Sequence, residues 1–183
     1  GWLPIDTYAK AVDDIGDFPL KHDWESLRQG IIEQGGIRNS VLTAIAPNES
    51  SSLVSNTTNS VYPVRDTIMY KQSQKGNVLF IVPDYEKLKT VYQSAWDTPA
   101  KDIAEMYGLL TKFMDQGISC DEWVDYSKME GGRLSIKAQM QFILTFAKLG
   151  GKSLYYLNSK TKSAESLAQE DSGDDGCEAC KMW

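Results

Sequence analysis

The pattern of apolar and polar positions changes repeatedly between strand-like and helix-like along the chain, which predicts an α/β fold. Residues 40–46 form a short apolar run, and its length and two-sided apolarity predict a strand covered on both faces. Residues 67–71 and 78–82 are β-prone and share a glycine-containing connection, so we expect a hairpin there. Short strands are also predicted within 118–126 and over 152–158.

Apolar side chains recur at helical spacing between these runs, and a capping residue opens most of the helical stretches. Asp23 opens the first long helix, which the glycines at 35 and 36 end. Thr98 and Pro99 suit the start of another helix, Thr as N-cap and Pro at the first helical position. The predicted helices are a short one over 7–14 and longer ones over 23–34, 84–96, 98–115 and 135–149.

The strand over 40–46 leads directly into a turn suited to binding an anion. Pro47 stops the strand, and Asn48 with three following serines offers N-cap side chains, hydroxyls and free backbone N–H groups for a helix running to about residue 58. In α/β folds, ligands bind at the carboxyl edge of the strands. Most serine-rich turns of this kind are only capped helices, so the pattern alone leaves both interpretations open.

Length and charge narrow the classes of protein. The 183 residues are enough for one domain with a core, and the net charge of −6 argues against a general nucleic-acid binder. We find no apolar stretch of membrane-spanning length and no signal-peptide pattern at Gly1, so a cytoplasmic protein without membrane contact is expected. The start without methionine is compatible with a fragment, a processed product or one piece of a split protein.

Composition divides the chain into two regions, a folded part over 1–160 and a polar tail over 161–183 that we expect to be disordered. Cys177 and Cys180 lie in this tail at a spacing that suits either a disulfide ring or half of a zinc site. Zinc would need two more ligands, and only Cys120, expected in the core, and His22 remain. We therefore expect no metal and favour a redox pair on a mobile arm, because thiol–disulfide exchange requires a sulfur that reaches its partner.

Tyr155 and Tyr156 are adjacent in the last predicted strand. Successive strand residues face opposite sides, so one ring should point inward and the other outward. Two packing tyrosines with satisfied hydroxyls would explain the pair without any further role.

Four motifs in this order resemble the C-terminal part of the large, catalytic subunit of aerobic class I ribonucleotide reductase. The resemblance covers nearly the whole chain. Its motifs are Pro47-Asn48-Glu49-Ser50-Ser51-Ser52 with Ser55-Asn56-Thr57-Thr58-Asn59, then Val82-Pro83-Asp84-Tyr85, Tyr155-Tyr156, and Cys177-Glu178-Ala179-Cys180-Lys181.

The resemblance implies the C-terminal portion of a ten-stranded α/β barrel with flanking helices and a disordered redox tail. Tyr155 and Tyr156 correspond to the inner and outer tyrosines of a radical relay. Cys177 and Cys180 correspond to the dithiol that re-reduces the active site and is itself reduced by thioredoxin or glutaredoxin. The turn that holds the diphosphate of a ribonucleoside diphosphate corresponds to Pro47, Asn48, Glu49, Ser50 and Ser51, with the side chain of Glu49 expected to point aside.

The family's thiyl-radical cysteine, its catalytic Glu and Asn and its N-terminal allosteric region have no match here. The resemblance therefore implies two protein partners: an N-terminal piece of the large subunit, with sites for allosteric ATP and dATP, and a radical-generating small subunit with a dinuclear iron or manganese centre. The alternative is a non-catalytic relic that retains phosphate affinity. A cobalamin-dependent reductase is a third possibility, but it would not need the relay formed by Tyr155 and Tyr156.

Overall fold

Two parallel strands form the central layer of the computed structural model, which describes residues 3–16, 18–73 and 76–160. Strand β3 (Cys120–Asp125) pairs with strand β4 (Leu154–Lys160), and both strands lie where the sequence predicts strands. β3 is buried along its whole length, whereas most of β4 is exposed. β4 therefore forms an open edge of the sheet.

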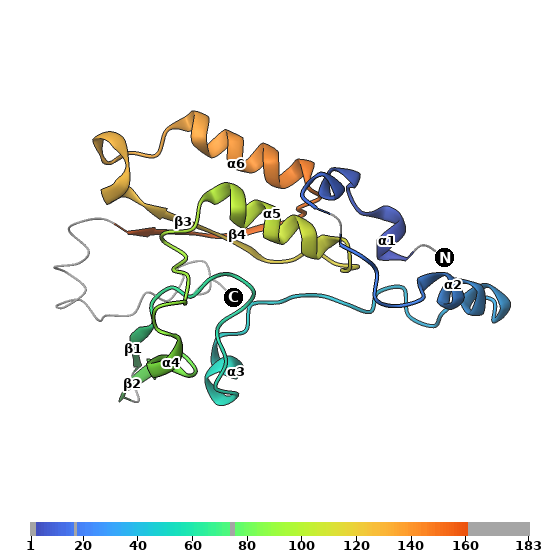
Figure 1. The fold of residues 1–183 in the computed structure, drawn as a ribbon, viewed down its shortest axis with the longest axis horizontal. Helices are drawn as coiled ribbons and strands as arrows, with labels where there is room; N and C mark the ends of the chain where they lie inside the picture. The colour runs from blue at the N-terminus through green and yellow to red at the C-terminus, as the bar shows by residue number, and fades with distance from the viewer. Residues whose placement is uncertain (1–2, 17, 74–75, 161–183) are drawn as a thin grey trace, which may run out of the picture.

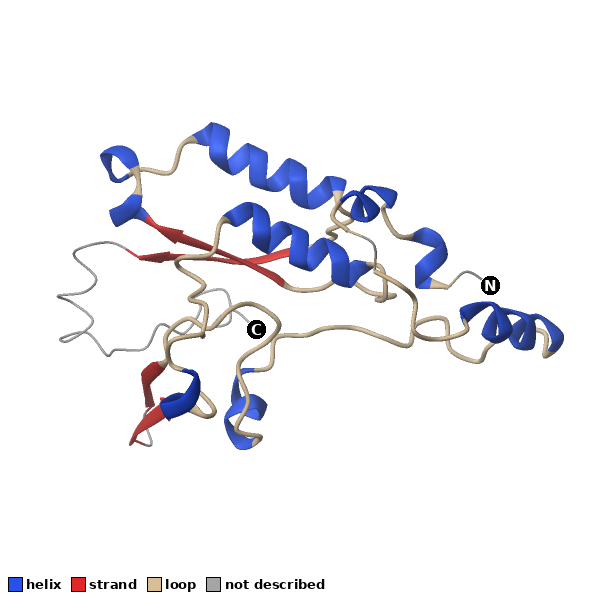
Figure 2. Ribbon diagram, viewed as in Figure 1, coloured by secondary structure: helices blue, strands red, loops and turns tan. Residues whose placement is uncertain are grey.

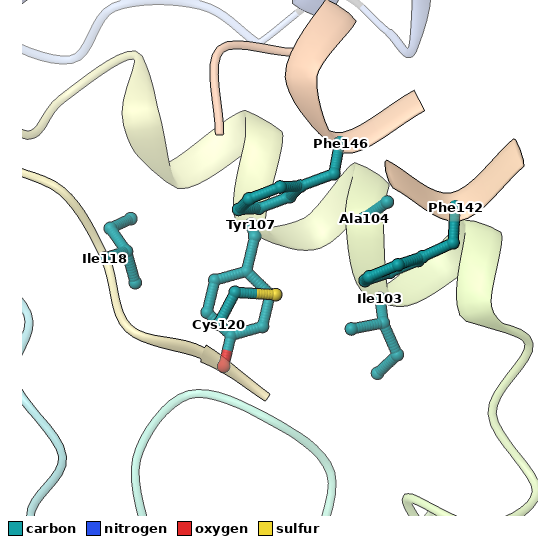
Figure 3. Close-up of a cluster of buried hydrophobic side chains, with 7 residues drawn as sticks. All are labelled: Ile103, Ala104, Tyr107, Ile118, Cys120, Phe142 and Phe146. Carbon is teal, nitrogen blue, oxygen red and sulfur yellow. The ribbon is translucent and has the colours of Figure 1, made fainter. Parts of the chain in front are cut away.

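Helices α5 (Ala100–Thr111) and α6 (Ile136–Lys148) cover one face of this sheet (Figure 1). Ser135 caps α6 by accepting the N–H of Ala138 at 3.1 Å. The N-cap of α5 is Pro99, so the predicted N-cap at Thr98 is wrong; the Thr98 hydroxyl donates to the Ser94 carbonyl at 2.8 Å instead. Both predicted helices are therefore confirmed, although α5 ends four residues early. The core between helices and strands consists of Ile103, Ala104, Tyr107, Ile118, Cys120, Phe142 and Phe146 (Figure 3).

The N-terminal region contributes α1 (Pro4–Thr7), the 3-10 helix η1 (Lys10–Asp14) and α2 (Trp24–Glu33). Asp23 caps α2 as predicted, by accepting the N–H of Ser26 at 2.9 Å. Arg28 of α2 donates two hydrogen bonds of 2.6 Å to the carboxylate of Asp6 in α1. These bonds lower the pKa of Asp6 to about 2 and join the two helices by a bidentate ion pair.

A second group of elements lies apart from the sheet: α3 (Glu49–Val54), strands β1 (Ile68–Ser73) and β2 (Gly76–Ile81), and α4 (Tyr85–Leu88) (Figures 1 and 2). β1 and β2 form the predicted antiparallel hairpin. The predicted helix over 84–96 is wrong, because α4 makes only about one turn. Ser94 pairs with Val64 in a parallel bridge and the N–H of Ala95 donates to the Val64 carbonyl at 2.8 Å, which draws the chain out of a helix.

The segment over 40–46 is extended but is not the doubly covered strand that its apolarity predicts. Only Ile45 pairs, through a parallel bridge to Ile118, and Leu42 is 63% exposed. The carboxylate of Asp115 fixes the segment instead, accepting from the N–H groups of Leu42 at 2.9 Å and Thr43 at 3.1 Å. These two bonds lower the pKa of Asp115. The segment thus runs beside the sheet, on the side of β3 away from β4.

Two short 3-10 helices, η2 (Tyr126–Lys128) and η3 (Glu130–Gly132), connect β3 to α6. Among the described residues, no helix combines the length and the apolar character required to cross a bilayer. The tail that carries Cys177 and Cys180 lies outside the described residues.

Candidate functional site

The turn over residues 47–51, which begins α3, is the candidate anion site. Asn48 occupies the N-cap position, but this side chain makes no cap bond: its Oδ1 accepts the N–H of Ser60 at 2.7 Å instead. The expectation that the side chain of Asn48 caps the helix is therefore wrong. Because the first N–H groups of an α-helix have no partner within it, the turn presents backbone donors beside the exposed residues Ser50 and Ser51.

A buried hydroxyl holds this turn in place. Ser52 is 2% exposed, and its Oγ donates to Oδ1 of Asn59 at 2.6 Å. The Thr57 N–H donates to the Ser52 carbonyl at 2.9 Å. α3 ends at Val54, four residues before the predicted end, because the chain turns back at Asn56, which has a φ of +50°. The loop after α3 is thereby folded against the turn that would receive an anion.

Tyr155 and Tyr156, which we call the tyrosine pair, lie against each other on β4. Their ring centroids are 3.9 Å apart with an interplanar angle of 51°, and about half of each residue is exposed. The prediction that the rings point to opposite faces of the strand is therefore wrong.

A β-bulge explains this difference. Cys120 pairs with Leu154 and Glu122 pairs with Leu157, so β4 advances by three residues where β3 advances by two. The tyrosine pair together therefore opposes the single residue Asp121. A bulge interrupts the alternation of side chains and re-aims them, which is how two successive rings come into contact.

Asp121 on β3, which the sequence analysis did not single out, bonds to the strand of the tyrosine pair. Asp121 is 5% exposed, and its carboxylate accepts the N–H of Tyr156 and the side-chain amide of Asn158, each at 3.3 Å. Burial raises the pKa of Asp121, while these two hydrogen bonds act in the opposite direction. The signal for Asp121 in the sequence was its place as an acidic residue inside a predicted strand. A carboxylate buried there needs hydrogen-bond donors from neighbouring residues.

Asn158 extends this network to the loop that follows α3. Its Oδ1 accepts from Nη2 of Arg65 at 3.2 Å. The Arg65 guanidinium also lies 5.2 Å from the centre of the Trp123 ring, and the Tyr62 ring packs on Trp123 at 5.1 Å between centroids. The loop after α3 is thereby connected to both strands of the sheet.

The segment that leads to the candidate anion site and the tyrosine pair lie on opposite sides of the chain that forms β3. On one side, Ile45 pairs with Ile118 two residues before Pro47 begins the turn. On the other side, the tyrosine pair opposes Asp121, three residues after Ile118 along the chain. Since strands rise by about 3.3 Å per residue, the level of Ile45 and that of the tyrosine pair are about 10 Å apart along this part of the chain.

Two further buried groups lie on β3. Cys120 is fully buried, as the sequence predicts, and burial with the nearby Asp121 and Glu122 raises the pKa of its thiol to about 12. Burial also raises the pKa of Glu122, which accepts from Nε2 of Gln139 at 2.7 Å. A thiol with this pKa is unreactive at neutral pH, so Cys120 is a core residue.

Several predicted site features fall outside what can be described. Cys177 and Cys180 lie beyond residue 160, and the side chain of Glu49 is not among those described. Over the described ranges, no group of three or more His, Cys, Asp or Glu residues is placed to hold a metal ion.

Comparison with known proteins shows which family the chain matches. Residues 1–157 match the family model described as the ribonucleotide reductase barrel domain. The whole chain is 43% identical to the ribonucleoside-diphosphate reductase subunit alpha of Haemophilus influenzae and 41% identical to the ribonucleoside-diphosphate reductase 1 subunit alpha of Escherichia coli. It is 32% identical to the subunit alpha of Enterobacteria phage T4. In each case the chain spans 24% of the relative's length.

Proposed function

The chain belongs to the ribonucleotide reductase barrel-domain family, and we propose that it supplies the C-terminal part of a reductase large subunit. The complete enzyme would convert ribonucleoside diphosphates to 2'-deoxyribonucleoside diphosphates by radical chemistry, for DNA precursor synthesis. The observation that carries the proposal is the contact between the rings of Tyr155 and Tyr156, 3.9 Å apart, in a chain of this family.

The turn over residues 47–51 would hold the diphosphate of the substrate. Its support is the open N-terminal turn of α3, whose N-cap side chain bonds to Ser60 and leaves backbone N–H groups to an anion. The exposed hydroxyls of Ser50 and Ser51 would add donors, and Pro47 would set the entry of the turn. The backbone of Glu49 would serve the site with its carboxylate pointing aside.

The tyrosine pair would carry the radical between the small subunit and the substrate site. In the inward step, one electron passes from Tyr155 to the oxidised Tyr156, and the proton of the Tyr155 hydroxyl passes to the phenoxyl oxygen of Tyr156. The radical thereby moves by one residue with electron and proton balanced. Two phenols have similar potentials, and the short distance between the rings supports direct transfer.

Cys177 and Cys180 would return the active site to its reduced state. Their thiols would reduce a disulfide formed elsewhere in the large subunit, become a disulfide themselves, and be reduced by thioredoxin or glutaredoxin. The spacing of the two cysteines in a polar tail supports this role.

The open edges of the sheet support assembly with the rest of a large subunit. Leu154 and Leu157 on β4 are about half exposed, as is Val41 on the far side of β3. An apolar edge of this kind pairs with further strands, here those of a ten-stranded α/β barrel. That remaining part would bring the reacting cysteine and the sites for allosteric ATP and dATP, and the small subunit would bring its dinuclear metal centre.

Reconstitution tests this proposal. The purified chain is mixed with the N-terminal part of the large subunit and the small subunit, and 2'-deoxyribonucleoside diphosphate is measured with thioredoxin as reductant. We expect product only when all three polypeptides are present. No product with thioredoxin, glutaredoxin or a small dithiol would favour a non-catalytic relic.

A further inference from the structure

The β-bulge at the tyrosine pair leaves a backbone group that the regular ladder cannot serve. β4 places two residues opposite Asp121, so one residue there is extra to the pairing. A buried backbone N–H without a partner costs about as much as a lost hydrogen bond. At this bulge the Asp121 side chain takes the place of the missing ladder acceptor, because its Oδ1 accepts the N–H of Tyr156.

The same carboxylate holds the strand immediately after the tyrosine pair. Its Oδ2 accepts from Nδ2 of Asn158, which also donates to the Glu122 carbonyl at 3.4 Å. Asn158 is in turn fixed by Arg65 through its Oδ1. The buried side chain of Asp121 therefore bonds to β4 at two residues, Tyr156 and Asn158.

We propose that Asp121 is a positioning residue for the radical relay, holding the β4 bulge that brings the rings of Tyr155 and Tyr156 into contact. This inference rests on the proposed function, in which radical transfer requires the two rings to be in contact. Asp121 itself takes up neither electron nor proton. It determines the ring-to-ring distance, on which the rate of transfer between the two phenols depends.

Three variants separate this role from a general loss of stability. Asp121→Ala removes both acceptors, whereas Asp121→Asn keeps an oxygen for the Tyr156 N–H. Asp125→Ala is the matched control: Asp125 is on the same strand and 7% exposed, but its carboxylate accepts from Ser127 and pairs with Lys128, away from the tyrosine pair. Far-ultraviolet circular dichroism reports whether each variant is folded.

The first readout does not depend on activity. In the full chain with labelled tyrosines, nuclear Overhauser contacts between ring protons of Tyr155 and Tyr156 report whether the rings touch. We expect these contacts in the wild type, Asp121→Asn and Asp125→Ala, and their loss in Asp121→Ala. Contacts that persist in folded Asp121→Ala would overturn the proposal. If Asp121→Ala does not fold, Asp121→Leu, which fills similar space without an acceptor, takes its place with the same expected loss.

The second readout is turnover in the complex with the N-terminal part and the small subunit. Asp121→Ala is expected to lower kcat by about 10- to 100-fold with KM unchanged, since small misplacements of reacting groups have effects of this size. Asp121→Asn should restore most of the rate, and Asp125→Ala should retain it. An active wild-type complex in which Asp121→Ala keeps full turnover overturns the positioning role alone. An inactive wild-type complex overturns the proposed function and this role with it.

Discussion

The ring centroids of Tyr155 and Tyr156 lie 3.9 Å apart although the residues are successive on β4. A regular strand would send these rings to opposite faces. The contact exists because both residues oppose the single residue Asp121 across a β-bulge. The feature that best suits the chain to a radical relay is therefore a departure from regular strand geometry.

Asn48→Asp tests the anion site. Aspartate is a good N-cap and keeps an oxygen for the Ser60 N–H, so the turn should persist. The added negative charge would repel the substrate diphosphate. In the reconstituted enzyme we expect KM to rise about tenfold with kcat unchanged. Asn39→Asp, at an exposed residue before the extended segment over 40–46, is the control that should leave KM unchanged. An equal rise in KM in both variants would argue against a diphosphate site at the 47–51 turn.

Cys177→Ser and Cys180→Ser test the redox tail. Each substitution removes one thiol, so the pair can no longer form its disulfide or be reduced by thioredoxin. We expect thioredoxin-driven turnover to stop while turnover with a small dithiol continues. Cys120→Ser, at the buried cysteine, is the control: it should not lower turnover with thioredoxin more than turnover with the small dithiol. If turnover with thioredoxin and turnover with the small dithiol both fall in the Cys177 and Cys180 variants, these cysteines have another role.

Glu122→Gln tests the buried carboxyl on β3. Burial raises its pKa above the ordinary value of 4.5, so the protonated form stabilises the fold at low pH and this contribution is lost as pH rises through the raised pKa. Gln139 Oε1, buried and without a hydrogen-bond partner among the described residues, could accept from the new amide. We expect urea unfolding at pH 8 to show a gain of about 1 kcal/mol that shrinks towards pH 4.

The exposed acid Glu86 provides the control for that measurement. Its side chain is 84% exposed, so Glu86→Gln should change the unfolding free energy little at either pH. A Glu122→Gln variant less stable than the wild type at pH 8 would mean that the carboxylate is the favoured form.

Gly108→Ala and Gly30→Ala test the packing of α5 on α6. A Cβ at Gly108 would lie 2.6 Å from the Cβ of Leu149, whereas a Cβ at Gly30 in α2 meets nothing within 4 Å. Overpacking should make Gly108→Ala less stable by about 1–3 kcal/mol. Gly30→Ala should gain about 0.5–1 kcal/mol from the better helix propensity of alanine. Thermal unfolding of both variants measures these changes in stability. Equal shifts of the Tm in Gly108→Ala and Gly30→Ala would contradict the close approach of α5 and α6.

The sequence predicted those elements whose causes are local. α2 and α6 begin where Asp23 and Ser135 provide caps, and the hairpin follows from two β-prone runs around a glycine. The prediction of a long helix after Asp84 was wrong because Val64, distant in sequence, pairs with Ser94. Residues 40–46 carry the apolarity of a covered strand, but within the described residues only Ile45 forms a bridge, to Ile118.

For the candidate site, the sequence pointed to residues but not to their arrangement. The tyrosine pair and the serine-rich turn were visible as motifs, whereas the bulge depends on the register between β4 and β3, which no local pattern encodes. Asp121 was missed for the same reason: its two donors, on Tyr156 and Asn158, lie on another strand.

Turnover of the reconstituted complex with Tyr155→Phe tests the central claim most directly. The substitution removes only the hydroxyl and keeps the ring on Tyr156, so folding and assembly should be those of the wild type. We predict that the wild-type chain restores formation of 2'-deoxyribonucleoside diphosphate and that Tyr155→Phe abolishes it while still binding both partners. Full activity of Tyr155→Phe would contradict the relay and make the two tyrosines a packing pair.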